Sequence, residues 1–261
     1  MKLIVTRPAA QAAGWVQRLH ALGLQAASLP LIGVAPLDDP APVRAAWAGL
    51  SAYALVVFVS PNAVQHFFAH APVLAVWPRT LLAGSTGPGT SAALLDAGIP
   101  PSLLVEPAED AASFDSEALW QSLRNRDWAG RHVLVVRGED GRDWLAQTLR
   151  EQGAVVDFVA AYRRLPPVLD AAAAQLLQAA IDAPAQHLWL FSSSEAIAHL
   201  QALTLSMAPA ANWSTSRALA SHPRIVQTAR EAGFGQVDTV APAPEAVWAW
   251  LQGPNLQFRG L

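Results

Sequence analysis

The run Leu3-Ile4-Val5-Thr6-Arg7 recurs 130 residues later as Val133-Leu134-Val135-Val136-Arg137. Each run has enough successive apolar residues for a buried strand, and each ends on an arginine. A helical pattern follows both runs and stops sixteen residues after the arginine, at Gly23 and at Gly153. Glycine readily adopts the left-handed conformation that ends a helix. The chain is therefore expected to contain one structural unit in two divergent copies.

Two further pairs of stretches favour the same repeat. The segment 57–64 resembles 190–197 at an offset of 133, and 87–90 resembles 222–225 at an offset of 135. Strands that alternate with helices of about ten to fourteen residues predict parallel sheets with helices on both faces. We therefore expect an α/β fold of two similar doubly wound parallel-sheet lobes, formed from a divergent internal repeat.

Two proline-rich segments, near 30–38 and 160–168, hold equivalent places in the two copies and are expected to form a two-stranded hinge. The residues alone allow two arrangements. The lobes are either consecutive, divided near residue 130, or interleaved, with the first 35 residues folding with the C-terminal part. Ligands of such sheets bind at the carboxyl ends of the strands. The working site is accordingly expected in the cleft between the lobes.

The composition excludes several classes of chemistry and of partner. The 261 residues are 52% hydrophobic, enough for two cores, and include no cysteine, which excludes disulfides, thiolate metal sites and a cysteine nucleophile. Lys2 is the one lysine, so a Schiff base or a phosphate-loop lysine has no internal candidate. A net charge of −3 with scattered arginines argues against a nucleic-acid partner. With no run long enough for a signal peptide or a membrane span, we expect a cytoplasmic protein with no membrane partner.

Polar residues follow the predicted strands and are the candidate binding groups. Hydroxyls, backbone N–H groups and positive helix ends gathered at strand ends suit an anion. The alternative is that these residues only cap helices. The candidates are Thr6-Arg7, Ser60-Pro61-Asn62, Gly87 to Thr90, Arg137-Gly138-Glu139 and Ser192-Ser193-Ser194.

Three other patterns carry weaker hypotheses. The segment 84–90 is rich in glycine but lacks the lysine of a phosphate loop, so a tight turn is favoured over a nucleotide site. His66 and His70 have the i, i+4 spacing of two metal ligands, but no third ligand accompanies them and no metal is expected. Tyr162 lies in the second hinge, where its phenol would face the cleft as a weak acid or would simply pack.

Five motifs follow one another over nearly the whole chain: Val5-Thr6-Arg7-Pro8, Phe58-Val59-Ser60-Pro61-Asn62-Ala63-Val64, Gly87-Pro88-Gly89-Thr90, Val136-Arg137-Gly138-Glu139 and Tyr162-Arg163. In this order they resemble the uroporphyrinogen-III synthase family. A late Phe191-Ser192-Ser193-Ser194 stretch and the paired hinges add to the resemblance.

The resemblance implies the interleaved arrangement, with one lobe formed by 1–36 and 165–261 and the other by 37–164. It implies an enzyme, a lyase, that closes linear hydroxymethylbilane to uroporphyrinogen III with loss of water and inversion of the last pyrrole. It also implies that no metal or organic cofactor takes part. A monomer in heme biosynthesis is expected, with this small molecule as its partner.

The resemblance also assigns roles to the candidate residues. Tyr162 would assist departure of the substrate hydroxyl group. The carboxylate arms would be bound by the following residues: Arg7, Ser60, Asn62, Gly87, Thr90, Arg137, Ser192, Ser193 and Ser194.

Two positions depart from the family pattern. Val59 stands where the family often has threonine, and His222 stands where the first copy has the glycine of its turn. The runner-up is a non-catalytic protein that binds a small anion on the same two-lobed scaffold. A third hypothesis, a nucleotide-dependent transferase, requires nucleotide to bind at 84–90.

Overall fold

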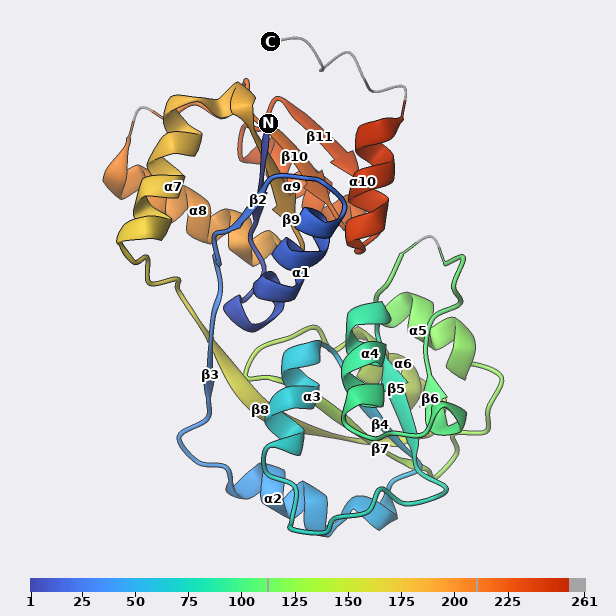
Figure 1. Ribbon diagram of the computed structural model, residues 1–261. Helices are drawn as coiled ribbons and strands as arrows, with labels where there is room; N and C mark the ends of the chain where they lie inside the picture. The colour runs from blue at the N-terminus through green and yellow to red at the C-terminus, as the bar shows by residue number, and fades with distance from the viewer. Residues whose placement is uncertain (112, 210, 254–261) are drawn as a thin grey trace. The chain divides into compact units, whose positions relative to one another are not determined.

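The computed structural model describes residues 1–111, 113–209 and 211–253, which form two compact units (Figure 1). Unit 1 comprises Met1–Gly33 and Leu165–Leu261, and unit 2 comprises Val34–Arg164. Unit 1 contains β1 (Lys2–Val5), α1 (Ala9–Ala21), β2 (Ala26–Ser28), α7 (Ala171–Asp182), η3 (Pro184–Gln186), β9 (His187–Phe191), α8 (Ser194–Met207), β10 (Arg217–Ala220), α9 (Pro223–Glu231), β11 (Gln236–Thr239) and α10 (Pro244–Gln252).

Unit 2 is built in the same alternating way. Its elements, with the strand that leads into it, are β3 (Gly33–Pro36), α2 (Ala41–Ala48), η1 (Leu50–Ala52), β4 (Leu55–Phe58), α3 (Pro61–Phe68), β5 (Leu82–Ser85), α4 (Pro88–Asp96), η2 (Pro101–Leu103), β6 (Leu104–Val105), α5 (Ser116–Leu123), β7 (His132–Gly138), α6 (Trp144–Glu151) and β8 (Val155–Leu165).

Each unit holds one sheet, and every strand pair with a described register is parallel. The strand order is β11-β10-β9-β1-β2 in unit 1 and β3-β8-β7-β4-β5-β6 in unit 2. If β7 is matched to β1 and β4 to β9, as the sequence offsets predict, the two orders agree apart from the extra strand β3. The predicted class, α/β with parallel sheets, is confirmed, while the origin of the two units in a duplication stays a prediction.

Side chains alternate between two cores across the unit 2 sheet. Val56, Phe58, Leu134 and Val136 pack with α2, α3 and α4. Their neighbours Leu55, Val57, Val133 and Val135 pack with α5 and α6 on the opposite face. The period of two in a strand sends successive side chains to opposite faces, so a strand covered by helices on both sides is apolar throughout.

The chain crosses between the units in two strands that are neighbours in one sheet. The first crossing follows Gly33, rather than residue 36, and the second follows Arg164. These crossings fall in β3 and at the end of β8, which Figure 1 shows side by side.

The helix that the sequence predicts after Arg137 begins only at Trp144. The Arg137 guanidinium bonds the Gly141 carbonyl and pairs with Asp143, which holds the intervening residues in a loop. No helix among the residues that the structure describes is long and apolar enough to cross a membrane.

Candidate functional site

A pocket lies at the carboxyl ends of the unit 1 strands. The residues that line it follow β1, β9, β10 and β11 or belong to α1 and α10, and they include Val5, Arg7, Trp15, Ser192, Ser221 and Pro242. Parallel sheets bind their ligands at this edge, because the turns there present backbone amides and helix N-termini. This pocket lies at the edge of the sheet where the sequence places the candidate binding groups, and their role stays a prediction.

Arg7 provides the cation of this pocket. Its guanidinium carbon lies 4.3 Å from the centroid of the Trp15 ring, and Nη1 donates to Oε1 of Gln11 at 3.3 Å. Burial lowers the pKa of Arg7 to about 10, which leaves the group charged at neutral pH. Among the residues placed by the structure, no carboxylate lies within ion-pair distance of it. A desolvated guanidinium with no neutralising carboxylate favours an incoming anion.

The three successive serines after β9 have different partners. Ser192 lines the pocket with Arg7. Ser193 is the N-cap of α8, and its Oγ accepts from the Glu195 amide at 3.2 Å. Ser194 Oγ lies 3.0 Å from Thr228 Oγ1, so it joins α8 to α9. Of the three serines, Ser192 is the one that lines the pocket.

Arg137 in unit 2 corresponds to Arg7 in the predicted repeat, but its charge is already matched. Its Nη1 pairs with Asp143 and donates to the Gly141 carbonyl at 3.3 Å. The guanidinium carbon lies 4.1 Å from the centroid of the Phe158 ring. The arginine is thereby held by its own unit.

Ser60 and Tyr162 come together in unit 2 although 102 residues separate them. Ser60 is the N-cap of α3, and its Oγ accepts from the Ala63 amide at 3.1 Å. The same Oγ lies 3.1 Å from the Tyr162 hydroxyl. Tyr162 is 1% exposed and belongs to the unit 2 core, so of the two alternatives that the sequence left open it packs. It packs inward because β8 places it beside Gly138 and α3 covers its ring.

The predicted glycine turn caps α4 and is closely packed. The Gly87 amide donates to Ser85 Oγ at 3.1 Å, and Pro88 has no N–H, so the next amide along the turn is that of Gly89. A Cβ at position 87 would lie 3.0 Å from Cβ of Phe114, which leaves no room for a side chain.

Two predicted binding residues are buried. Asn62 is 7% and Thr90 is 3% exposed, because both lie in the first turn of a helix that packs against the sheet. Their side chains therefore lie below the surface of unit 2 rather than on it.

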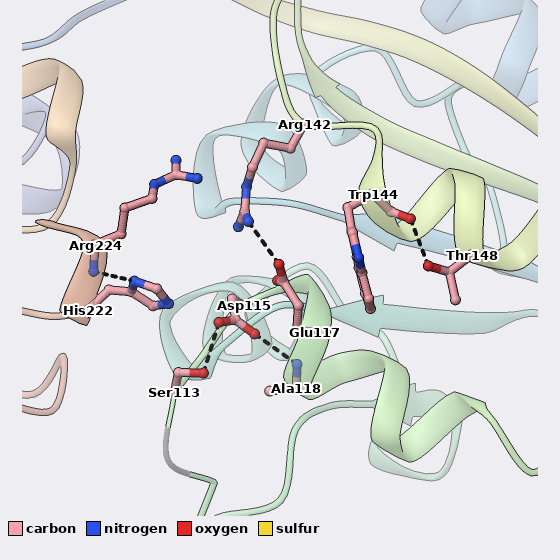
Figure 2. A network of polar contacts seen from close by, with 9 residues as sticks. All are labelled: Ser113, Asp115, Glu117, Ala118, Arg142, Trp144, Thr148, His222 and Arg224. Carbon is pink, nitrogen blue, oxygen red and sulfur yellow. Dashed lines mark hydrogen bonds and ion pairs between the residues drawn. The ribbon is translucent and has the colours of Figure 1, made fainter.

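The segment that covers Gly87 is held by a network of polar contacts (Figure 2). Asp115 caps α5, accepting from Ser113 Oγ at 2.8 Å and from the Ala118 amide at 2.8 Å. Arg142 Nη1 donates to Oε1 of Glu117, two residues after Asp115, at 2.9 Å. These bonds fix the backbone on both sides of Phe114 and hence its position over Gly87.

His222 occupies the corresponding turn in unit 1. Its Nδ1 accepts from the Arg224 amide at 3.1 Å, so the ring replaces a glycine by acting as the N-cap of α9 (Figure 2). Among the described residues, no group of three His, Asp or Glu is placed to hold a metal ion.

Several residues near these positions were not predicted from the sequence. Trp15 supports Arg7, Asp143 neutralises Arg137, and Ser85 with Ser91 ties the glycine turn to α4. The spacing of Asp143, six residues after Arg137 in a polar loop, was an available signal for the ion pair. The sequence gives no signal that pairs Arg7, which precedes α1, with Trp15 in the middle of that helix.

The fold and these strand ends define a class: a two-unit parallel α/β protein with an arginine in a pocket at the carboxyl edge of one sheet. A family model described as "Uroporphyrinogen-III synthase HemD" matches residues 13–247. The chain belongs to the uroporphyrinogen-III synthase family, which is a family of enzymes. This membership does not favour the alternative of a non-catalytic binding protein.

Individual relatives agree with this assignment. The chain is 31% identical over 184 residues to uroporphyrinogen-III synthase of Salmonella typhimurium, covering 66% of this chain and 68% of the relative. It is 30% identical over 167 residues to the Escherichia coli protein of the same name, covering 63% and 65%.

Two solved structures share the fold. They are a mutant uroporphyrinogen III synthase from Thermus thermophilus, with a TM-score of 0.57, 16% identity and coverage of 97% and 98%, and the Helicobacter pylori uroporphyrinogen-III synthetase, with a TM-score of 0.55, 17% identity and coverage of 96% and 98%.

Proposed function

We propose that this chain is a uroporphyrinogen-III synthase, a lyase that converts linear hydroxymethylbilane to uroporphyrinogen III. The hydroxymethyl group loses its hydroxyl, and its carbon bonds to the substituted carbon of the last pyrrole. The bond from that pyrrole carbon to its former methylene bridge then breaks, the bridge bonds to the free carbon of the same pyrrole, and that carbon loses one hydrogen, so that the hydroxyl and the hydrogen leave together as water. The family match over residues 13–247 is the observation that carries the proposal. The cytoplasmic location and the monomeric state expected from the sequence are part of the same proposal.

The chemical problem is one of positioning. The linear substrate carries eight flexible carboxylate arms, and its last pyrrole must react through a substituted carbon before uncatalysed closure gives the uninverted isomer. Holding such a chain in one reactive geometry is worth many orders of magnitude in rate. An enzyme for this reaction therefore needs several anion-binding groups on a rigid frame.

Unit 1 offers the clearest such group. Arg7 is charged, desolvated and backed by the Trp15 ring, and it shares its pocket with the Ser192 side chain. We propose that one acetate or propionate arm binds here through charge-assisted hydrogen bonds. Ser193 and Ser194 support this subsite from the first turn of α8.

Unit 2 offers neutral donors at its strand ends. In the proposal, the amide of Gly89 beside Gly87 and the hydroxyl of Ser60 contact the substrate, while the buried Asn62 and Thr90 shape these turns. Arg137 contributes positive potential but shares its charge with Asp143. Tyr162, through its contact with Ser60, assists departure of the hydroxyl group from the substrate.

The test is the isomer of the product. Purified protein is incubated with hydroxymethylbilane, and the oxidised products are separated by chromatography beside a heat-inactivated sample. The expected result is the type III isomer in the active sample and type I in the inactivated one. Type I alone in both samples would contradict the proposal, and a raised melting temperature without turnover would indicate the binding protein instead.

A further inference from the structure

The Tyr162 phenol is enclosed by its own unit. A Cβ placed on Gly138 would lie 3.2 Å from the Cε2 and Cζ atoms of Tyr162, so the ring occupies the space that this glycine leaves. On the α3 side, the His66 ring stacks on the phenol with centroids 5.7 Å apart and planes inclined by 27°. Tyr162 is 1% exposed, whereas Ser60 is half-buried, so Ser60 carries the more accessible of the two hydroxyl groups.

The direction of the hydrogen bond between the two hydroxyls follows from the need to satisfy buried donors. Among the described residues, Ser60 Oγ is the partner recorded for the Tyr162 hydroxyl, at 3.1 Å. If Ser60 donated, the phenol proton would be buried without an acceptor, which is costly. Tyr162 therefore donates and Ser60 accepts.

This direction leaves Ser60 with one free function. A serine hydroxyl has two acceptor lone pairs and one proton. The lone pairs receive the Ala63 amide and the Tyr162 hydroxyl, both at 3.1 Å. Ser60 is half-buried, so its proton is available to a partner outside the core.

We infer that Ser60 is the residue that contacts the substrate, donating a hydrogen bond to its hydroxymethyl oxygen, and that Tyr162 is a positioning residue that fixes the direction of this donor. The inference rests on the proposed function and changes the route by which Tyr162 acts. A donor held in place by two other bonds needs no reorganisation when the C–O bond weakens. Loss of the phenol hydroxyl should then matter only while Ser60 is present.

A double-mutant cycle tests this dependence, with kcat, KM and product isomer measured for Tyr162→Phe, Ser60→Ala and the double variant. Each single variant is expected to lower kcat 10- to 100-fold with KM changed less than about threefold. The double variant should match Ser60→Ala within about threefold. The type I fraction should rise as kcat falls, because uncatalysed closure then competes.

Two further variants separate this role from simple loss of a helix cap. Ser60→Thr keeps the hydroxyl and the cap, and it should restore most of kcat. Asp170→Ala removes the cap of α7, whose carboxylate accepts from the Ala173 amide at 2.7 Å, and it should lower the melting temperature with kcat unchanged.

Three results would overturn the inference: losses that multiply in the double variant, a wild-type kcat in Ser60→Ala, or a folded Ser60→Thr as slow as Ser60→Ala. Each presupposes that the wild-type protein forms the type III isomer. If the wild-type protein does not form the type III isomer, that result contradicts the proposed function itself, whatever the double-mutant cycle gives.

Discussion

Arg7 and Arg137 hold matching places at the ends of corresponding strands in the two units, yet their surroundings differ. Arg7 lies over Trp15 in a pocket and has no carboxylate within ion-pair distance among the described residues. Arg137 lies over Phe158 and is paired with Asp143. Both guanidiniums rest on an aromatic ring, but only one of them is neutralised by its own unit.

This difference in carboxylate partners indicates which arginine is available to a ligand. A guanidinium that already has a carboxylate gains little from a second one, whereas a desolvated guanidinium gains the full charge-assisted bond. The cost of desolvating Arg7 appears in its pKa, which burial lowers to about 10. We therefore expect Arg7 to bind a substrate carboxylate and Arg137 chiefly to organise the loop before α6.

The largest effect is expected from Arg7→Met, which keeps an unbranched side chain over Trp15 and removes the charge. The value of kcat/KM should fall 10- to 100-fold, about 1.4 to 2.7 kcal/mol, as expected for the loss of a charge-assisted bond. The melting temperature should stay the same or rise, because a desolvated cation without a carboxylate does not stabilise the fold. Steady-state kinetics and thermal unfolding of one preparation check both parts.

Lysine at position 7 is the matched control for charge. Arg7→Lys should recover part of the lost kcat/KM, because it restores a cation without the planar fork of donors. Equal activity of the Met and Lys variants would show that shape rather than charge matters at this position.

A smaller effect is expected from Arg137→Met. Since Asp143 already neutralises this charge, kcat/KM should fall less than about fivefold, which is the scale of an exposed ion pair. Asp143→Asn leaves the Arg137 charge without its carboxylate, so by the same reasoning it should not lower kcat/KM. A loss as large as that of Arg7→Met would remove the distinction between the two arginines.

The smallest effect concerns pH and the His66 ring beside Tyr162. Burial, and then the charge of His70, lower the pKa of His66 below its usual 6.5. The folded state thus binds fewer protons than the unfolded state, so this contribution to stability is present above about pH 6.5 and is lost as pH falls below it. Arg7 in unit 1 adds no such pH dependence, since it stays charged over this range.

Thermal unfolding at pH 7.5 and pH 5.5 measures this contribution. His66→Gln should narrow the difference in melting temperature between the two pH values, because it removes a group whose pKa is lowered on folding. An unchanged difference would mean that the pKa of His66 is the same in the folded and the unfolded state.

The sequence predicted those features that depend on local patterns. Apolar runs followed by helical periodicity predicted the strands and their order along the chain, and Ser60 and Ser193 were correctly taken from the strand–turn–helix pattern as residues at helix starts. The parallel sheets followed from the alternation of strands and helices.

The environment of each site residue could not be predicted in the same way, because it depends on contacts between distant segments. Tyr162 is buried because Gly138 leaves room for its ring and because α3 covers it, and neither contact is visible along the chain. The buried state of Asn62 and Thr90 likewise depends on how each helix packs on the sheet. A polar residue after a strand identifies the edge of the sheet, but packing decides whether it faces a ligand.

The most direct test of the contrast between the arginines is an NMR titration that observes the arginine side-chain Nε–H groups. The ligand is the oxidised octacarboxylate macrocycle of the proposed product, and the Arg7→Met and Arg137→Met variants assign the two signals. We predict a saturable shift of the Arg7 signal and little change at Arg137. A saturable shift at Arg137 with Arg7 unmoved would contradict the assignment of the carboxylate subsite to unit 1.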